Sequence, residues 1–330
     1  MNKYKILVTG GAGFIGSHLV DQLLATGHDV RVLDNLSNGK EANLYEAGRK
    51  NNFQFIKGDI LDKATCGKAL QGIEVVYHLA CLGVRHSLHN PFENHRVNAE
   101  GSLNILEAAL TNSVRKLFYI STSEIYGDIK QFPIDETGIP LPKTVYGASK
   151  LAGENYAYSY HTCFGMDTTT LRIFNNYGPR AHYEGDAGEI IPRSIVNLLY
   201  GKPPVIFGDG NVTRDFFYVK DTASALAGLL EIKNLQGQII NIGTGEEVTM
   251  RHLLEQIITL MQLNIKIDYM EDRPADVPRL WVNPAKFKQI TNFKSGFSFE
   301  QGLLETIRFY EDLSKGKELI NEIEVLNWKK

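Results

Sequence analysis

Short apolar runs alternate with amphipathic stretches through the first half of the chain. Six runs are typical of buried strands, at residues 5–10 (KILVTG), 29–34 (DVRVLD), 53–59 (FQFIKGD), 75–80 (VVYHLA), 116–121 (KLFYIS) and 168–174 (TTTLRIF). Between them, apolar residues recur at helical spacing, as in Phe14, Ile15, Leu19, Val20, Leu23 and Leu24, and again in Leu103, Ile105, Leu106, Ala109 and Leu110. This alternation predicts an α/β fold with a doubly wound, parallel Rossmann-type sheet, which binds ligands at the carboxyl ends of its strands.

The regular alternation stops after residue 175, where prolines separate shorter elements. A helix near 220–231 and a strand near 238–242 are expected to return to the sheet. We therefore expect a sheet domain of residues 1–175 joined by 215–243. A smaller C-terminal domain of residues 176–214 and 244–330 is expected to cover its ligand edge. The charged tail from Ser314 to Lys330 is predicted to be a solvated helix.

Composition narrows the classes of function. The 330 residues are 43% hydrophobic and carry a formal net charge of -3, which gives no strong field for nucleic acid or an anionic membrane. No segment approaches the ~20 apolar residues of a membrane span, and the N-terminal apolar run is too short for a signal peptide. Three widely spaced cysteines argue against a disulfide framework or a zinc site. We expect a cytoplasmic protein that binds neither nucleic acid nor membranes.

A glycine-rich turn follows the first predicted strand and opens a helix. Its glycines are Gly10, Gly13 and Gly16, with Phe14 and Ile15 between the last two. Glycine allows a tight turn and close approach to a pyrophosphate, which the helix N-terminus then faces with free N–H groups. Such a turn alone is also compatible with an ordinary strand–helix loop, but the flanking strand and helix favour a dinucleotide site.

Asp34 ends the second predicted strand at the position expected for a carboxylate that binds adenosine ribose hydroxyls. A carboxylate there repels a 2′-phosphate, so the sequence favours NAD over NADP. Taken alone, Asp34 is equally compatible with a turn residue beside Asn35. Asp59 and Ile60 end the third strand, where an adenine is expected.

Tyr146 and Lys150 form a YxxxK pair, which places both side chains on one helix face. A nearby ammonium is expected to lower the phenol pKa and make Tyr146 a usable base. Elsewhere such a pair is a common surface feature; here it follows the fifth strand of a coenzyme sheet. At the end of that strand stand Thr122, Ser123 and Glu124, and we interpret Glu124 as an acid/base group rather than a solvated loop carboxylate.

The histidines do not predict a metal site. His78 lies within an apolar strand and is expected to be a hydrogen-bonded core residue. His86, His89 and His95 lack the helical or hairpin context of zinc ligands, so no metal is expected.

With these residues in place, the chain resembles the extended short-chain dehydrogenase/reductase family, and within it the nucleotide-sugar epimerases and dehydratases. The motifs that carry the resemblance occur in family order along nearly the whole chain: TGGAGFIG at 9–16, DNLSNG at 34–39, HLA at 78–80, NAEGSLN at 98–104, YGASK at 146–150, FNNYGPR at 174–180, FGDGNVTRDFFYV at 207–219, NIGTG at 241–245 and RPADV at 273–277.

The resemblance implies further roles. It adds Asn35, Asn38, Gly39, Leu79 and Ala80, together with Tyr146 and Lys150, to the residues that contact NAD. It implies that a nucleotide-sugar substrate is bound by Asn175 and by Arg214 and Arg273 at the diphosphate, by Phe207 beside the base, and by Arg85 and Ser87 beside the sugar. Guanidinium groups suit phosphate oxygens, although either Arg214 or Arg273 alone would be an ordinary surface charge. The helices at 99–112 and 146–162 are implied to pair in a homodimer.

Enzymes of this kind share a 4-keto intermediate. The resemblance implies that Tyr146 takes the proton of the sugar 4-hydroxyl, and the residues around the ketone decide the product. Thr122-Ser123-Glu124 resembles the dehydratase arrangement, in which a carboxylate removes the C5 proton and water leaves from C6. We therefore expect an NAD-dependent nucleotide-sugar 4,6-dehydratase that acts on a UDP-hexose or UDP-hexosamine.

Three alternatives remain. The segments DNLSNG and GVRHS are more similar to UDP-sugar 4-epimerases, and nucleotide-sugar decarboxylases also carry Thr-Ser-Glu. A non-catalytic NAD-binding regulator is a different class, against which the intact set of tyrosine, lysine, hydroxyl and carboxylate argues.

Overall fold

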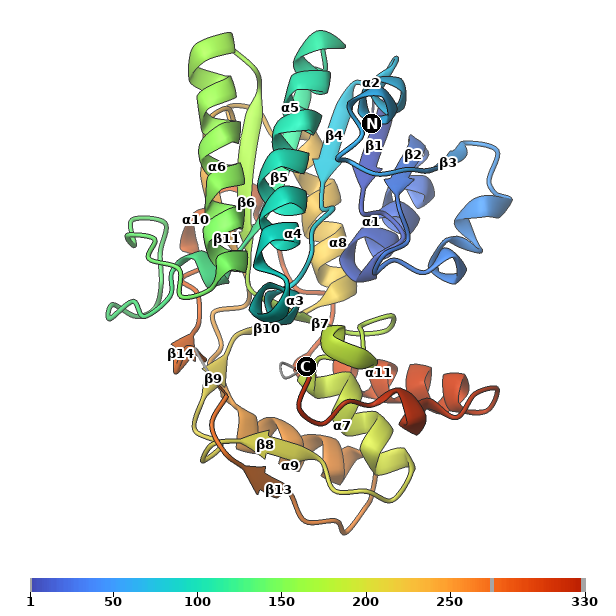
Figure 1. The fold of residues 1–330 in the computed structure, drawn as a ribbon, viewed down its shortest axis with the longest axis vertical. Coiled ribbons are helices and arrows are strands. Elements are labelled where there is room, and N and C mark those ends of the chain that lie inside the picture. Colours follow the sequence, from blue (N-terminus) through green and yellow to red (C-terminus); the bar gives the residue numbers. More distant parts are fainter. Residues whose placement is uncertain (1, 274–275, 328–330) are drawn as a thin grey trace.

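The computed structural model describes residues 2–273 and 276–327. Pro274 and Ala275 of the RPADV motif, and the end of the tail at 328–330, lie outside the described residues. A large α/β part and a smaller part stacked below it make up the molecule (Figure 1).

Seven parallel strands form the central sheet in the order β11-β6-β5-β4-β1-β2-β3, which confirms the predicted doubly wound Rossmann-type fold. The strands are β1 (Lys5–Thr9), β2 (Asp29–Asp34), β3 (Phe53–Lys57), β4 (Val75–His78), β5 (Lys116–Thr122), β6 (Thr168–Ile173) and β11 (Ile239–Ile242). The chain order reverses between β1 and β4, and ligands bind at such a switch point. β11 is the edge strand expected near 238–242.

Helices cover both faces of this sheet (Figure 1). Apolar side chains of α1 (Phe14–Ala25) and α8 (Val219–Gly228) pack on one face, and those of α2 (Lys63–Leu70), α5 (Gly101–Thr111) and α6 (Val145–Phe164) pack on the other. Short helices α3 (Val84–His89) and α4 (Pro91–His95) lead into α5, and α10 (Ala285–Thr291) packs beside β11. His78 is fully buried and bonded to Thr9 and Ser102, as expected of a core histidine.

The smaller part is built from later elements around its own apolar core. Its helices are α7 (Ile190–Leu199), α9 (Met250–Leu260) and α11 (Phe299–Ser314). Its short strands pair in twos and threes: β7 (Asn175–Tyr177) with β10 (Phe216–Tyr218), β8 (Val205–Phe207) with β13 (Asp268–Met270), and β9 (Thr213–Arg214) with β12 (Val248–Thr249) and β14 (Arg279–Leu280).

The tail does not form the predicted solvated helix. α11 ends at Ser314, and a single turn at Leu319–Glu322 follows. Leu319 is fully buried, and the Asn327 amide donates to the carbonyl of Gly188. Pattern reading missed these anchors because they are isolated residues without helical spacing.

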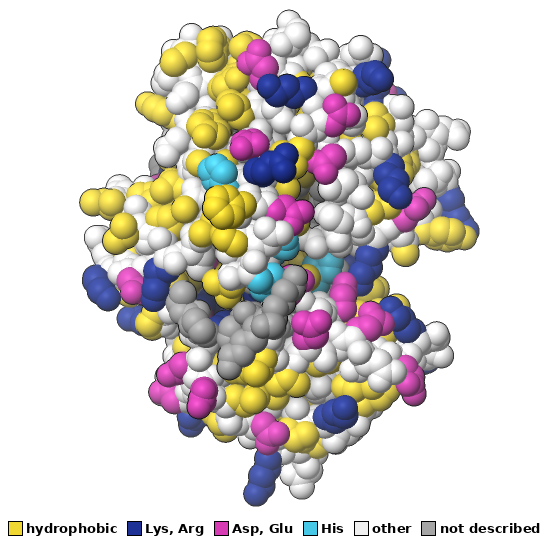
Figure 2. All heavy atoms as spheres, in the orientation of Figure 1, with side chains coloured by type: hydrophobic (Ala, Val, Ile, Leu, Met, Phe, Trp, Pro, Cys, Tyr) yellow, Lys and Arg dark blue, Asp and Glu magenta, His cyan; other side chains and the backbone are white. Residues whose placement is uncertain are grey.

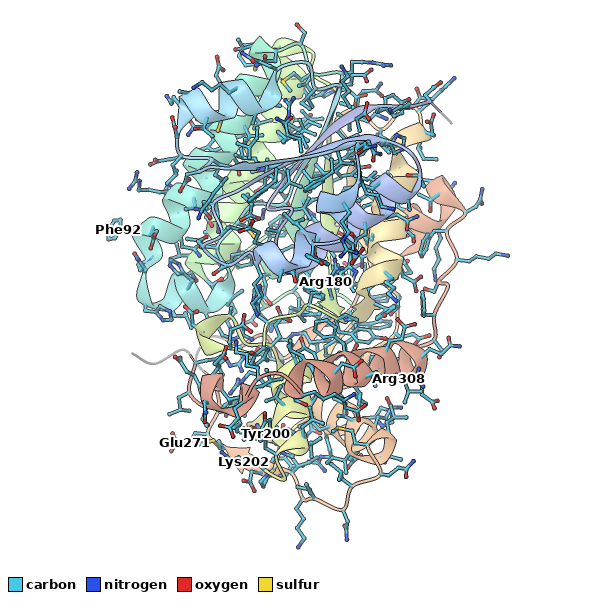
Figure 3. The ribbon with its side chains drawn as sticks, turned by 90° about the vertical axis from the view of Figure 1, so that its right-hand side faces the viewer. Phe92, Arg180, Tyr200, Lys202, Glu271 and Arg308 are labelled. Atoms are coloured by element: carbon cyan, nitrogen blue, oxygen red, sulfur yellow. The ribbon has the colours of Figure 1, made fainter. Side chains whose placement is uncertain are left out.

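Polar bonds join the two parts beneath α1. Arg180 donates to Asp21 at 2.8 Å, and Lys40 lies 2.6 Å from the Glu184 carboxylate. Arg180 can be followed in Figure 3 between the sheet part and the helices below it. These bonds hold the smaller part against the carboxyl ends of the strands.

Candidate active site

A cavity of about 460 Å³ lies between the carboxyl ends of the sheet strands and the smaller part. Residues of the glycine-rich turn, β2, β5 and α6 border it on one side, and Phe207, Arg214 and Arg273 border it on the other. Every residue predicted for the site except Ser87 borders this cavity.

Close backbone packing requires the glycines of the first turn. Gly10 has a φ of 70°, and a Cβ there would lie 2.8 Å from the backbone nitrogen of Ala80. A Cβ on Gly16 would lie 2.2 Å from the Gly10 carbonyl oxygen. α1 begins at Phe14 immediately afterwards, so its unbonded N–H groups open toward the cavity as a pyrophosphate site requires.

Asp34 is buried at the end of β2 with its carboxylate beside the cavity. Its oxygens accept the N–H groups of Ala12 at 2.9 Å and Leu36 at 2.8 Å. Burial raises the pKa of Asp34, and these two bonds oppose the rise. A Cβ on Gly39 would lie 2.8 Å from the carboxylate, so glycine keeps the space beside it open. Just beyond the ends of β2 and β3, the Asn35 amide donates to the Asp59 carboxylate at 2.9 Å.

Tyr146 and Lys150 both border the cavity from the same face of α6. Lys150 is 2% exposed, and burial lowers its pKa. The expected lowering of the phenol pKa is wrong for this structure: burial raises the pKa of Tyr146 well above its usual value, and Cys81 and Glu124 add to the rise. Desolvation of the phenolate is the largest effect, so the protein on its own favours the neutral phenol of Tyr146.

Thr122 lies beside the Tyr146 phenol. β5 ends at this residue, and the interaction of its hydroxyl with the phenol opposes the rise of the phenol pKa. The same oxygen accepts the backbone N–H of Glu124 at 3.2 Å, which begins the one-turn helix Ser123–Ile125. A Cβ on Gly147 would lie 2.9 Å from the Glu124 carbonyl oxygen, so this glycine lets α6 pack directly on the turn.

Glu124 is half-buried and borders the cavity. Burial raises its pKa, Arg214, Arg85 and Arg273 oppose the rise, and Asp276 adds to it. A carboxyl group so placed beside a phenol and facing guanidinium groups can take and return a proton at a bound molecule.

The smaller part contributes cationic and amide groups. Arg214 donates to the Asp276 carboxylate at 2.6 Å and to the Val277 carbonyl at 2.7 Å. The Arg273 guanidinium lies 5.2 Å from the Phe207 ring centroid, and burial lowers its pKa to about 10, which leaves it charged at neutral pH. Asn175 Oδ1 is buried at the cavity and has no hydrogen-bond partner among residues 2–273 and 276–327, which suits a ligand donor.

The two residues predicted from the loop at 83–87 behave differently. Arg85 borders the cavity and donates weakly to the Ala187 carbonyl at 3.4 Å. Ser87 is not brought into the cavity: its buried hydroxyl donates to the Val84 carbonyl at 2.6 Å, within the first turn of α3. A hydroxyl three residues into a helix is satisfied by that turn, which the motif alone did not reveal.

Sequence reasoning missed several residues at the cavity, chiefly Cys81, His182, Asp186 and Glu189. The last three lie in the irregular segment before α7, where neither periodicity nor a motif marks them. It also missed the support from Asn98, whose amide exchanges bonds of 2.8 and 3.0 Å with the backbone of Leu82 and so fixes the loop that carries Arg85. The NAEGSLN motif was the available signal.

Comparison with known proteins places this site in a family. A sequence model of the GDP-mannose 4,6 dehydratase family matches residues 7–306, and the chain belongs to this family. It is thus a nucleotide-sugar-modifying enzyme of the extended short-chain dehydrogenase/reductase type.

Relatives of three activities are similar to it. The chain is 36% identical over 310 residues to a putative UDP-glucose 4-epimerase of Methanocaldococcus jannaschii, covering 93% of this chain and 98% of that one. It is 34% identical to a UDP-N-acetyl-alpha-D-glucosaminuronate decarboxylase of Bacillus cytotoxicus, covering 94% and 99%. It superposes with a TM-score of 0.89 on the dTDP-glucose 4,6-dehydratase DesIV of Streptomyces venezuelae with NAD bound, at 30% identity, covering 96% and 99%.

The coenzyme is NAD. The glycine turn, the open space beside Asp34 and the paired Tyr146 and Lys150 fit it. When bound, NAD supplies an acceptor and donor of hydride at the reacting sugar. Among the described residues, no helix combines the length and apolarity that crossing a bilayer requires.

Proposed function

We propose that this enzyme is a nucleotide-sugar 4,6-dehydratase acting on a UDP-hexose or UDP-hexosamine. The observation that carries the proposal is the position of Glu124, a half-buried carboxyl group that borders the cavity beside the Tyr146 phenol. Elimination needs a base for the C5 proton, and a 4-epimerase needs none.

The residues have distinct tasks in this scheme. Tyr146 acts as a phenolate, which the positive charges of Lys150 and of bound NAD would favour, and takes the proton of the 4-hydroxyl. Lys150 would also hold the coenzyme ribose. The 4-ketone makes the C5 proton acidic, and Glu124 removes it. The C6 hydroxyl leaves as water with the proton that Glu124 took from C5. After C6 is reduced, C5 takes up the proton that Tyr146 removed from the 4-hydroxyl, which regenerates the phenolate. Ser123 lies in the same turn, buried, and positions Glu124 rather than acting as a separate acid.

Substrate contacts follow the same proposal. Arg214, Arg273 and Asn175 bind the diphosphate, Phe207 lies beside the base, and Arg85 faces the sugar. Residues 1–175 with 215–243 would form the NAD-binding domain, and residues 176–214 with 244–330 the nucleotide-sugar-binding domain. The enzyme is proposed to work as a homodimer.

Mass analysis of reaction products tests the proposal. The NAD-loaded enzyme is incubated with UDP-glucose, UDP-N-acetylglucosamine, dTDP-glucose and GDP-mannose. We expect a product lighter by one water from a UDP sugar. Products of unchanged mass would instead support a 4-epimerase, which the similarity to the M. jannaschii protein favours. Tight NAD binding without turnover of any nucleotide sugar would support a regulator.

A further inference from the structure

Glu189 is an acidic residue of the cavity to which the proposed mechanism gives no task. It lies immediately before α7, and its backbone N–H donates to the His182 carbonyl at 2.7 Å. Its side chain does not cap the helix and borders the cavity instead. Within the described residues, no hydrogen bond to its carboxylate occurs, so its oxygens can accept from a ligand.

Arg85 places Glu189 near the proposed sugar end of the cavity, because its guanidinium donates to the carbonyl of Ala187, two residues before Glu189, at 3.4 Å. The charges of Arg85, His182 and Arg273 oppose the effect of burial on the pKa of Glu189. Arg85 and Arg273 also act on the pKa of Glu124. The same two guanidinium groups therefore influence both carboxylates, one at the end of β5 and one at the start of α7.

Glu189 alters the balance of charge in the cavity. Apart from Asp34, Asp59 and Lys150 at the coenzyme end, the cavity is bordered by three guanidinium groups, on Arg85, Arg214 and Arg273, and by four carboxylates, on Glu124, Asp186, Glu189 and Asp276. Asp186 lies 2.9 Å from the His89 ring, and the neighbouring Glu184 is paired with Lys40. The diphosphate already brings two negative charges, so none of these three guanidinium groups is left to balance a further anionic group on the sugar.

We propose that Glu189 is a specificity residue that makes the sugar subsite prefer neutral hexosyl groups to hexuronosyl groups. Its carboxylate accepts hydrogen bonds from sugar hydroxyl or amide groups and repels a C6 carboxylate, which cannot donate. The inference rests on the proposed function, because it assumes a nucleotide sugar in this cavity. It would separate this enzyme from relatives such as the B. cytotoxicus decarboxylase, whose name specifies a uronate.

Equilibrium binding tests the preference without turnover. NAD-loaded Tyr146→Phe protein, which cannot react, is titrated calorimetrically with UDP, UDP-glucose and UDP-glucuronate. If dTDP or GDP binds more tightly than UDP, the same titrations are made with that nucleotide and its glucose and glucuronate conjugates. We expect UDP-glucose to bind about ten- to a hundredfold more tightly than UDP-glucuronate. Repulsion between the Glu189 carboxylate and the sugar carboxylate in a partly buried site is of this size.

Three variants in this background isolate Glu189. Glu189→Gln should reduce the ratio of the UDP-glucose and UDP-glucuronate affinities about tenfold. The change should come mainly from tighter binding of UDP-glucuronate, and the affinity for UDP should stay the same. Glu189→Asp keeps the charge and should retain the preference. Glu255→Gln is the matched control, because this exposed acid lies on α9 in the same part of the molecule and does not border the cavity.

Three results would overturn the inference: equal affinities in the parent protein, unchanged discrimination in Glu189→Gln, or a gain for UDP as large as that for UDP-glucuronate. The last would mean that Glu189 faces the diphosphate. Retained UDP binding shows that each variant is folded. Failure of the dehydratase proposal appears separately, in the product masses of the wild-type enzyme.

Discussion

The guanidinium group of Arg172 donates to both carboxylate oxygens of Glu154, with Nε–Oε1 at 3.0 Å and Nη2–Oε2 at 2.8 Å. Each side chain is 3% exposed. Arg172 lies on β6, and Glu154 lies on α6 one turn after Lys150. The remaining nitrogen donates to the Tyr126 hydroxyl at 2.7 Å, two residues beyond Glu124. This pair therefore fixes the helix of Tyr146 and the turn of Glu124 relative to each other.

Glu154→Gln should strongly destabilise the fold, because it leaves a buried guanidinium without its counter-charge. We expect the free energy of unfolding to fall by about 3–5 kcal/mol in denaturant titrations. The control is Glu74→Gln, which removes an exposed pair with Arg115 and should cost less than about 1 kcal/mol. Equal effects of the two substitutions would contradict the structural role of the buried pair.

NAD should bind more tightly than NADP, because a 2′-phosphate would meet the Asp34 carboxylate in the space that Gly39 leaves open. Fluorescence titration of the apo protein with each coenzyme measures the ratio. Asp34→Asn keeps the size of the side chain and one of its two backbone hydrogen bonds, and should narrow the ratio of the two affinities about tenfold or more. A wild-type preference for NADP would refute the function assigned to this carboxylate.

The parts of the site predicted from the sequence are those that follow from strand ends and fixed spacing. Gly10 and Asp34 directly follow or end strands, and Tyr146 and Lys150 are one helical turn apart. Parallel strands end at one sheet edge, so these residues meet whatever the loops do.

Glu189, His182 and the bond of Ser87 could not be predicted in this way. Their positions depend on how the smaller part packs against the sheet, through contacts such as that of Lys40 with Glu184, and on local bonds within irregular segments. The prediction of a lowered phenol pKa failed for a related reason. The sequence spacing shows that Lys150 lies one helical turn from Tyr146, but it does not show the burial that raises the phenol pKa.

The protein should form a homodimer through α5 and α6. Large apolar side chains remain exposed there, including Leu103 at 38%, Tyr158 at 54% and Phe164 at 57%. Phe92 on the adjoining α4 projects away from the molecule in Figure 3, and hydrophobic side chains gather over the upper left of Figure 2, where α5 and α6 lie.

Light scattering should give twice the chain mass. Leu103→Glu combined with Tyr158→Glu should yield monomers, whereas Tyr45→Glu, at an exposed site beside α1, should not. A concentration-independent monomer for the wild type would refute the interface.

Acid should destabilise the fold through its buried histidines. Burial, and then the charge of Arg180, lowers the pKa of His18 from 6.5 to about 4, so the folded protein keeps it neutral where the unfolded chain protonates it. Its contribution to stability is complete above pH 6.5 and is lost progressively toward pH 4, at up to about 1.4 kcal/mol per pH unit. His18→Gln retains a donor for the Pro179 carbonyl and should flatten the pH dependence of the unfolding free energy. Because the buried carboxylates are common to both proteins, identical slopes would show that His18 is not involved.

Glu124→Gln distinguishes elimination from epimerisation. Glutamine keeps the size and part of the hydrogen bonding of Glu124 but cannot accept the C5 proton. The variant should still oxidise C4, because Tyr146 and Thr122 are intact, and should then stop before water leaves. Stopped-flow absorbance should show reduced coenzyme accumulating on the enzyme, while product analysis detects water loss about 10²–10⁴-fold more slowly than in the wild type.

The matched control is Tyr146→Phe, which should remove both the absorbance rise and the product while NAD binding is largely retained. The two variants thus separate the first proton transfer from the second.

The wild-type rate of water loss should also fall on acidification through a pKa above the usual glutamate value, since only ionised Glu124 can act as the base and burial raises its pKa. If the wild type interconverts two sugars of equal mass, and Glu124→Gln does so equally well, Glu124 is no base and the 4-epimerase replaces the dehydratase.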